Sequence, residues 1–377
     1  MIALAILRSF FALIACLGTL YLLATVFGAL RFQRASRRGA FPSQADGTLT
    51  MSILKPVRGL EPELFENLCS FCAQAYPAFD VVFGVQDASD PAIPVINEVI
   101  ANFPERARLV VEPLQQPGNP KVANLTNMFP HARGEIIVIA DADMRVDADY
   151  LAAIAVAFGD PRAGAVTCPY TGEPRGGLAS ELAVLQLNDQ FAPSVLVATM
   201  FGDPAFCFGS TMAVRRSVLA EIGGLEALAS TIADDYMLGA LVTRAGYRVH
   251  LSRYIVRNVV HERSVEAMLE HELRWARTIR SIRPLGYAST FVTFPLPFAL
   301  LSLLLGPSRA SAWIALIVIL TMRLTMHFTM ARLFGIKNQE RLAWLLPLRD
   351  CLGLYVWVKG LFGSTVTWKD QVTHTRY

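Results

Sequence analysis

Two acidic residues directly after a hydrophobic run give the sharpest chemical signal in the sequence. Asp141 and Asp143 are one residue apart and follow residues 135–140, a pattern typical of a buried strand. Two carboxylates in this position can face one divalent cation, and Mg²⁺ and Mn²⁺ prefer oxygen ligands that bridge to phosphates. The alternative is a helix start, where Asp is favoured, because Asp147 and Asp149 follow. The strand before the pair favours the metal site.

Asp87 and Asp90 follow a second predicted strand, residues 81–86. Asp90 precedes Pro91, and proline suits the first position of a helix. We therefore interpret Asp90 as the residue that caps a helix and Asp87 as a ligand for the base or ribose of a nucleotide.

A second acidic pair, Asp234 and Asp235, opens a helix predicted over residues 234–245. Adjacent side chains point in different directions on a helix, so one carboxylate can stabilise the helix start while the other enters a site. A carboxylate near a metal and a phosphate can act as a general base toward a hydroxyl group. Two acids that interact only with the helix dipole are the alternative.

Two basic residues, Lys121 and Arg274, are further candidates for binding phosphate groups. Lys121 follows a Gly/Pro loop and can reach a diphosphate as a point charge, or it is a solvated loop lysine. Arg274 stands beside Trp275 and combines a fork for phosphate oxygens with a flat face for a sugar ring. Arg274 also begins a stripe of arginines before the last hydrophobic block, and we expect most of this stripe at anionic lipid headgroups: Arg274, Arg277, Arg280 and Arg283.

Short hydrophobic runs alternate with amphipathic stretches in the middle of the chain. Strands are predicted over residues 50–54, 81–86, 108–112, 135–140 and 211–214, and helices over 62–75, 91–103, 122–129, 178–200 and 234–245. This alternation indicates an α/β fold with a mostly parallel sheet. Ligands bind at the carboxyl ends of the strands in such sheets, and both Asp87 and Asp141 fall there.

The composition of the 377-residue chain indicates a membrane protein. Charged residues make up only 17%, against about 25% in soluble domains, and the net charge of +3 is too small to indicate a nucleic-acid partner. Residues 9–30 carry no charge and approach the ~20 residues that span a bilayer. The arginines that follow place the next segment in the cytoplasm by the positive-inside rule: Arg31, Arg34, Arg37 and Arg38.

A second hydrophobic block comprises residues 284–308, 310–334 and 342–362. The first two segments can form a hairpin, and the third either spans the membrane or lies in the interface with its charges at the headgroups. We therefore predict an N-terminal anchor over residues 1–39, a cytoplasmic catalytic domain over 40–283, and two or three membrane helices with a tail over 284–377.

Several motifs, taken together, resemble those of one family. They are Ser52-Ile53-Leu54-Lys55-Pro56, Val85-Gln86-Asp87, Asn119-Pro120-Lys121 with Asn124, Asp141, Ala233-Asp234-Asp235-Tyr236 and Arg274-Trp275. In this order they resemble the ceramide glucosyltransferase family of membrane-bound GT-A glycosyltransferases, which includes bacterial hopanoid-biosynthesis glycosyltransferases. His271 differs from the Gln or Arg usual at its position in that family.

The resemblance implies a role for each matching residue. Asp87, Lys121, Asn124, Asp141 and Arg274 would bind the nucleotide sugar, Asp141 and Asp143 would hold Mg²⁺ or Mn²⁺, and Asp235 would be the catalytic base. The residues that would line the acceptor and sugar are Asp234, His271 and Trp275.

We therefore expect an inverting glycosyltransferase at a bacterial inner membrane. It would move glucose or N-acetylglucosamine from a UDP-sugar to the hydroxyl group of a membrane lipid, either ceramide or a hopanoid polyol, one sugar per acceptor. The alternatives are a processive polysaccharide synthase, which normally needs more spanning helices, and a non-catalytic membrane adaptor.

Overall fold

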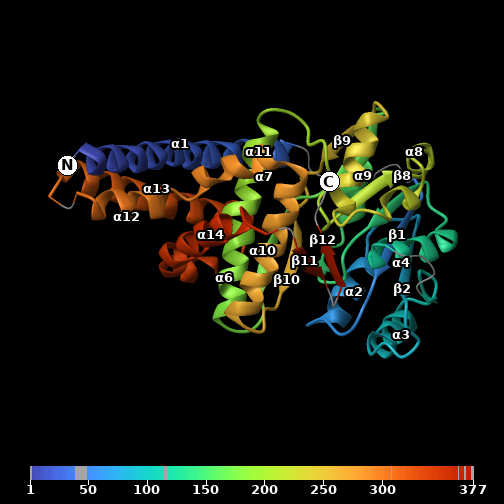
Figure 1. Cartoon of the computed structure of the whole chain (residues 1–377). Coiled ribbons are helices and arrows are strands. Elements are labelled where there is room, and N and C mark those ends of the chain that lie inside the picture. Colours follow the sequence, from blue (N-terminus) through green and yellow to red (C-terminus); the bar gives the residue numbers. More distant parts are fainter. Residues whose placement is uncertain are drawn as a thin grey trace. The chain divides into compact units, whose positions relative to one another are not determined.

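The computed structural model describes residues 2–38, 49–113, 118–306, 308–363, 365–368 and 371–374. The chain divides into two compact units, each built from separate segments (Figure 1). Met1–Arg34, Gly172–Met200 and Val260–Tyr377 form what we call the helical unit, and Ala35–Thr171 and Phe201–Val259 form the sheet unit. The predicted domain boundary at residues 39 and 40 lies outside the described residues, and the one at 283 and 284 stays a prediction.

The sheet unit contains a seven-stranded sheet in the order β3-β2-β1-β4-β8-β6-β9. All neighbouring strands are parallel except β8, which runs antiparallel to both β4 and β6. The strands are β1 (Met51–Pro56), β2 (Phe79–Val85), β3 (Ala107–Val111), β4 (Ile136–Ile139), β6 (Ala163–Thr167), β8 (Met212–Arg215) and β9 (Arg248–Leu251). The predicted α/β fold with a mostly parallel sheet is confirmed.

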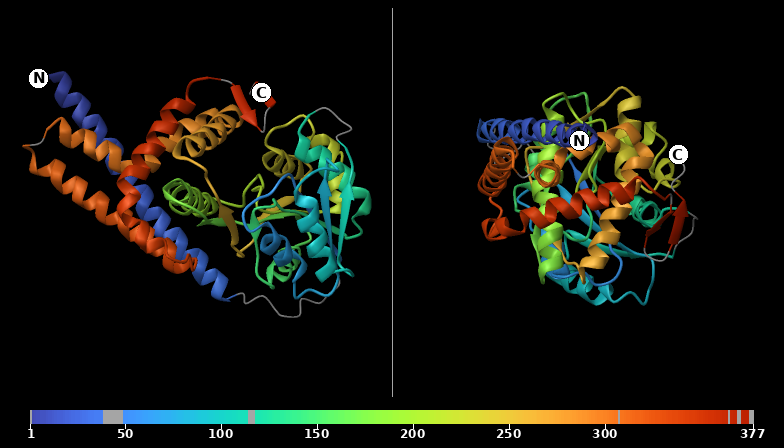
Figure 2. Two further views of the ribbon diagram at one scale, coloured as in Figure 1. Left: turned by 90° about the horizontal axis from the view of Figure 1, so that it is seen from below. Right: turned by 60° about the vertical axis from the view of Figure 1, so that its left-hand side comes forward.

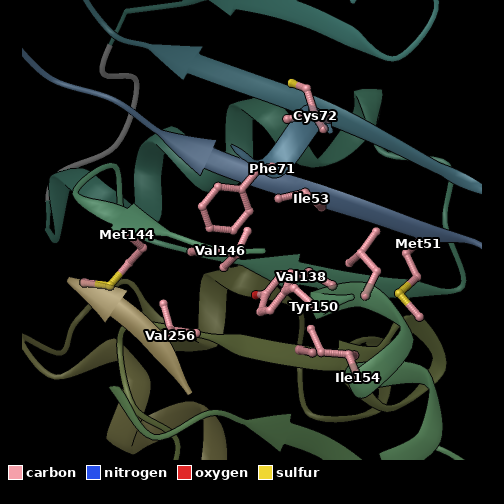
Figure 3. Close-up of a cluster of buried hydrophobic side chains, with 14 of the residues drawn as sticks. Met51, Ile53, Phe71, Cys72, Val138, Met144, Val146, Tyr150, Ile154 and Val256 are labelled. Atoms are coloured by element: carbon pink, nitrogen blue, oxygen red, sulfur yellow. The ribbon is translucent and has the colours of Figure 1, made fainter. Parts of the chain in front are cut away.

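Alternate residues of the strands belong to two separate hydrophobic clusters. Ile53 of β1 and Val138 of β4 lie in one cluster (Figure 3), whereas Leu54 and Ile139 lie in the other. Side chains alternate between the two faces of a strand, so both faces of this sheet are buried. This explains why the strands read as continuous hydrophobic runs.

Helices on the two faces contribute the rest of each cluster. The cluster with Ile53 receives side chains from α2 (Leu64–Cys72), α3 (Ala92–Asn102) and α5 (Tyr150–Ala157). The cluster with Leu54 receives them from α4 (Pro120–Met128), α8 (Arg216–Glu221) and α9 (Asp234–Arg244). The predicted helices of this unit are confirmed with small shifts of their ends. Strand β1 continues through Pro56, two residues beyond the strand predicted over residues 50–54.

A three-stranded sheet joins β5 (Met144–Arg145), β10 (Val256–Val260) and β7 (Tyr170–Pro174) in the order β5-β10-β7. The sequence predicted none of these strands. In the described part of the C-terminal tail, β11 (Thr365–Trp368) pairs with β12 (Gln371–His374).

The helical unit contains two helices long and hydrophobic enough to cross a membrane, among the residues that the structure describes. They lie within α1 (Ile2–Arg38), over Ile2–Arg34, and at α13 (Ala310–Leu333). The segments Pro284–Thr293 and Pro295–Leu304 (α12) are together also long and hydrophobic enough to cross a membrane, but the chain bends by 62° between them. Leu22 of α1 packs with Met326 of α13, and the two helices run side by side in both views of Figure 2.

The helix predicted over residues 178–200 is confirmed as one continuous helical stretch with a π-helical turn inside it: α6 (Leu178–Gln186), the turn (Leu187–Phe191) and α7 (Ala192–Thr199). In the third hydrophobic segment, Arg349 and Asp350 of α14 (Leu346–Gly360) are fully buried and do not face headgroups, whereas Lys359 of the same helix is exposed. Arg280 of α10 (Val265–Ile282) donates to the backbone carbonyls of Leu361 and Gly363, and the place of the arginine stripe at lipid headgroups stays a prediction.

Candidate active site

A partly buried lysine joins acidic residues from two distant segments in the sheet unit. Nζ of Lys121 lies 2.8 Å from Oδ1 of Asp141 and 3.1 Å from Oδ2 of Asp234. Lys121 is in the first turn of α4, which the side chain of Asn119 caps by accepting from the backbone N–H of Lys121. The structure therefore brings together three residues that the sequence predicted for the site.

The loop after β4 carries the Asp141–Asp143 pair. Nζ of Lys55, in β1 and fully buried, donates to the backbone carbonyl of Asp141 and lies over the ring of Phe71. Oδ2 of Asp143 accepts from Nδ2 of Asn258 at 2.8 Å. These contacts hold the loop at the carboxyl end of the strand.

Gly209 lies next to both halves of the site. A Cβ atom at this position would be 3.1 Å from Oδ2 of Asp141 and 3.7 Å from Oδ2 of Asp235. Asp235 is in the first turn of α9, and its Oδ1 accepts from the backbone N–H of Tyr236. The two carboxylates therefore border the same small space, which a side chain at position 209 would fill.

The crowded carboxylates change each other's protonation. Burial, followed by the charge of Asp141, raises the pKa of Asp143 to about 6. Burial, followed by the charge of Asp234, raises the pKa of Asp235 to about 6. Burial acts to lower the pKa of Lys121, but the nearby charges of Asp141 and Asp234 outweigh it and raise that pKa well above its usual value. The site therefore holds a lysine that stays positively charged, and two carboxyl groups, those of Asp143 and Asp235, whose raised pKa values make them easier to protonate.

A divalent cation fits the Asp141–Asp143 pair. Oδ1 of Asp143 is buried and has no hydrogen-bond partner within the described ranges, so one carboxylate oxygen is left for a ligand. No group of three or more His, Cys, Asp or Glu side chains is arranged to hold a metal ion among the described residues. A cation at this pair would therefore need further oxygen ligands from a substrate or water.

Two predicted nucleotide ligands lie close to β2: Asp87 follows the strand, and Asn124 of α4 contacts it. Oδ1 of Asp87, just past the strand, accepts from the backbone N–H and the hydroxyl of Ser89, and these bonds lower the pKa of Asp87. Asn124 is buried, and its Nδ2 donates to the carbonyl of Gly84 at 2.8 Å. Neither residue has a described contact with the Lys121 cluster, so their roles stay predictions. The capping role of Asp90 is confirmed, since its Oδ1 accepts from the N–H of Ala92.

The remaining predicted residues belong to the helical unit. Nδ1 of His271 is 3.0 Å from Oε1 of Glu262, and its ring centroid is 4.3 Å from that of Trp275. Trp275 is 38% exposed. Burial lowers the pKa of Arg274, and the charge of Glu262 opposes this effect. His271, Arg274 and Trp275 therefore form a polar and aromatic group on α10, and Glu262, which precedes the helix and was not predicted from the sequence, contacts His271.

Two residues of the sheet unit were also missed as parts of the site. Lys55 was given no role in the site, although it is fully buried there and burial lowers its pKa to about 7 against the opposing charges of Asp143 and Asp141. Burial, followed by the charge of Asp235, raises the pKa of Tyr170 well above its usual value. Lys55 could have been found as a charged residue inside a hydrophobic strand, whereas Tyr170 carried no local signal.

The sheet unit therefore combines a mostly parallel α/β fold with an acidic cluster around Lys121, and two helices of the chain are long and hydrophobic enough to cross a membrane. The chain belongs to Glycosyl transferase family 21, whose sequence profile matches residues 16–377.

The chain is similar to two ceramide glucosyltransferases of Caenorhabditis elegans. It is 27% identical to ceramide glucosyltransferase 1 over 215 residues, which is 56% of this chain and 46% of that protein. It is 21% identical to ceramide glucosyltransferase 3 over 380 residues, which is 97% of this chain and 80% of that protein. The chain therefore spans about half the length of the first relative. A similar solved structure is mannosyltransferase PcManGT from Pyrobaculum calidifontis in complex with GDP-Man and Mn²⁺, with 21% identity, a TM-score of 0.49 and coverage of 93% of this chain and 99% of that one.

Proposed function

We propose that this protein is an inverting transferase that moves a sugar from a UDP-sugar to the hydroxyl group of a membrane lipid. The observation that carries the proposal is the contact of Lys121 with both Asp141 and Asp234, which gathers a cation and carboxylates at one edge of the sheet. Membership of family 21 and the likeness to ceramide glucosyltransferases support a UDP-sugar donor and a lipid acceptor.

Asp235 is the proposed catalytic base. Its carboxylate borders the same space as Asp141, so a hydroxyl group there lies within reach of a proton acceptor. Asp235 accepts the proton as the acceptor oxygen attacks the anomeric carbon from the face opposite the diphosphate. The new bond forms to the sugar as the bond to the diphosphate oxygen breaks, and UDP leaves with that electron pair.

Lys121 is the proposed cation for the diphosphate. Before the donor binds, its charge is shared by the carboxylates of Asp141 and Asp234. A diphosphate oxygen can take the place of one carboxylate without leaving the ammonium group unpaired. Asp87 and Asn124 are proposed for the nucleoside part of the donor, and Arg274 for its phosphate oxygens.

Asp141 and Asp143 are the proposed ligands of Mg²⁺ or Mn²⁺. The unpartnered Oδ1 of Asp143 supports this assignment. When bound, such a cation stabilises negative charge on the departing diphosphate. Asn258 orients Asp143 by donating to its other oxygen.

Asp234, His271 and Trp275 are proposed to line the acceptor and the sugar. The tilted contact of Trp275 with His271, which is held by Glu262, supports an aromatic face for a sugar ring or for the lipid head. We further propose that residues 40–283 act at the cytoplasmic face of a bacterial inner membrane and that the hydrophobic helices bring the site to the lipid. A lipid resists leaving the bilayer, because each CH₂ group exposed to water costs about 0.8 kcal/mol.

The test is direct assay of the purified protein in detergent or nanodiscs. UDP-glucose, UDP-N-acetylglucosamine and UDP-galactose are each offered with ceramide and with a hopanoid polyol, in the presence of Mg²⁺ or Mn²⁺. We expect UDP release and a lipid carrying one sugar by mass spectrometry, with a β-linkage from the α-linked donor by NMR. Absence of UDP release with every pair overturns the proposal, and a ladder of products indicates a processive synthase instead.

A further inference from the structure

Lys55 is a fully buried lysine in the middle of the seven-stranded sheet, in β1 between β2 and β4. Side chains alternate between the faces of a strand, so Lys55 shares a face with Ile53, whose hydrophobic cluster also contains Phe71 (Figure 3). The Nζ atom of Lys55 lies 3.7 Å from the centre of the Phe71 ring. Burying a charged side chain in a hydrophobic cluster costs free energy, so the contacts of this lysine have to offset that cost.

The ammonium group of Lys55 contacts the turn that carries the two proposed metal ligands. Its Nζ donates to the backbone carbonyl of Asp141, and the same carbonyl accepts from the backbone N–H of Met144 at 3.2 Å. The bond from residue 144 back to residue 141 closes a turn of four residues, from which both carboxylates project. Lys55 therefore holds the first residue of the turn by its backbone, whereas Lys121 contacts the carboxylate of that residue.

Strand β10 holds the other end of this turn. The backbone N–H of Val259 donates to the carbonyl of Asp143 at 2.9 Å, and Asn258 donates to Oδ2 of Asp143. The turn is thus fixed at both ends, and with it the direction of Oδ1 of Asp143, the buried oxygen that has no hydrogen-bond partner among the described residues. A ligand oxygen that is oriented in advance binds a cation more tightly than one that has to be ordered on binding.

We propose that Lys55 is a positioning residue for the divalent cation: its bond to the carbonyl of Asp141 keeps the turn in the shape that binds the metal. This role rests on the proposed function, which includes a cation at Asp141 and Asp143. Coulomb's law alone makes a positive charge beside the site oppose a divalent cation, so losing the charge of Lys55 would strengthen metal binding. A positioning role has the opposite consequence, because metal binding weakens when the turn is released. The sign of the change therefore separates the two roles.

The experiment measures Mn²⁺ binding directly, so that it does not depend on transfer. Full-length protein in detergent is titrated with Mn²⁺ in the presence of UDP, and the free ion is followed by its electron paramagnetic resonance signal against a protein-free sample with the same UDP. We expect Lys55→Met to weaken Mn²⁺ binding about 10- to 100-fold, the usual effect of losing a group that orients a metal ligand. In rate assays the Mn²⁺ concentration for half-maximal activity should rise by the same factor, with kcat at saturating Mn²⁺ nearly unchanged. Unchanged or tighter Mn²⁺ binding in Lys55→Met overturns the inference.

Lys55→Met should fold, because a methionine suits the hydrophobic surroundings beside Phe71. The carbonyl of Asp141 also keeps its bond from the N–H of Met144 in this variant. Lys55→Gln is the second variant, in which a shorter side chain keeps a polar end but does not reach the carbonyl. It should weaken Mn²⁺ binding by a similar factor, so wild-type affinity in either folded variant contradicts the positioning role.

Ser52→Ala is the matched control, because Ser52 is equally buried in the same strand but lies near its other end. Its hydroxyl donates to Asp80 and accepts from the backbone N–H groups of Arg133 and Gly134. This variant should melt several degrees lower and bind Mn²⁺ like the wild-type protein. An equal loss of Mn²⁺ binding in Ser52→Ala means that Lys55 only stabilises the strand, and the inference fails. If Lys55→Met loses Mn²⁺ binding but no pair of substrates releases UDP from the wild-type protein, the proposed transfer fails while the role of Lys55 at the cation site stands.

Discussion

The ammonium nitrogen of Lys121 lies 2.8 Å from Oδ1 of Asp141, although one residue is in the first turn of α4 and the other is in the loop after β4. The same nitrogen also contacts Asp234 at the start of α9. One partly buried cation therefore ties together three separate segments of the chain. We therefore expect the positive charge of Lys121 to stabilise the fold around the site as well as to take part in the proposed chemistry.

Replacing Lys121 by methionine should lower both stability and donor binding. The variant leaves buried carboxylates without a counter-charge, which costs about 3 kcal/mol for a fully buried pair. We expect about 2 kcal/mol, because the side chain of Asp141 is 35% exposed. Chemical denaturation of the detergent-solubilised protein measures the loss, and calorimetry measures UDP binding.

Arg108→Met is the control for that variant. Arg108 makes an equally short ion pair with Asp80 at 2.7 Å, but the arginine is 31% exposed and lies outside the site. Its loss should cost less than about 1 kcal/mol and leave UDP binding unchanged. Equal losses in the two variants would contradict a special role for Lys121.

Replacing Asp235 by asparagine should remove the base while keeping the shape of the site. We expect kcat to fall by roughly 10²- to 10⁴-fold, the usual contribution of a general base, with UDP-sugar affinity nearly unchanged. Initial rates and donor titrations of the same preparation measure the two quantities. Full activity of Asp235→Asn would exclude Asp235 as the base.

The pH dependence should follow the raised pKa of Asp235, which is about 6 because of burial and the charge of Asp234. A base works only when it is deprotonated, so kcat/KM should be constant above that pKa. It should fall about tenfold for each pH unit well below it. Because Asp143 gains a proton in the same range, the profile is measured at saturating Mn²⁺. Constant activity down to pH 4.5 would contradict the assignment.

Metal affinity should depend on Asn258 as well as on Asp143. Asn258 donates to Oδ2 of Asp143 and leaves Oδ1 for the cation. We expect Asn258→Ala to weaken Mn²⁺ activation about 10- to 100-fold, and excess Mn²⁺ to restore the rate. Chelation with EDTA should abolish activity in both proteins. An unchanged Mn²⁺ titration in the variant would exclude the orienting role.

A buried ion pair in the helical unit offers a test of stability alone. Arg349 of α14 donates to both carboxylate oxygens of Glu272 in α10 at 2.7 Å. Arg349→Met should destabilise the protein by about 3–5 kcal/mol, because it leaves a buried carboxylate unpaired. The double variant with Glu272→Leu should recover most of that loss. If the double variant is no more stable than Arg349→Met alone, the loss of stability involves neighbours of the pair and does not come from the unpaired carboxylate of Glu272 alone.

The parts of the fold and of the site that could be predicted from the sequence are those that local patterns of residues determine. Ile53 and Leu54 could be assigned to a strand with two buried faces, since continuous hydrophobic runs are typical of covered parallel sheets. The ends of strands then located Asp87 and Asp141 correctly at one edge. Asp234 and Asp235 were found at a helix start, because acidic residues are favoured there.

Interactions between distant segments could not be predicted in the same way. Arg349 and Asp350 resembled interface charges, because their partners Glu272 and Arg323 lie 77 and 27 residues away. The π-helical turn at Leu187–Phe191 depends on bonds from Asn188 and Asp189 to other elements, and a periodic pattern does not contain that information. Lys55 was missed because the sequence alone did not reveal that the strand continues through it.

The helical unit is assembled from three separate stretches, and this determines when it can form during synthesis. Ala192 and Leu196 pack in one cluster with Leu22, made much earlier, and with Met326 and Met330, made much later. The residues of this middle stretch can therefore complete their cluster only after more than a hundred further residues have been synthesised and α13 has formed. A fragment that ends at residue 283 would never receive Met326 and Met330, so a shortened expression product would expose that cluster.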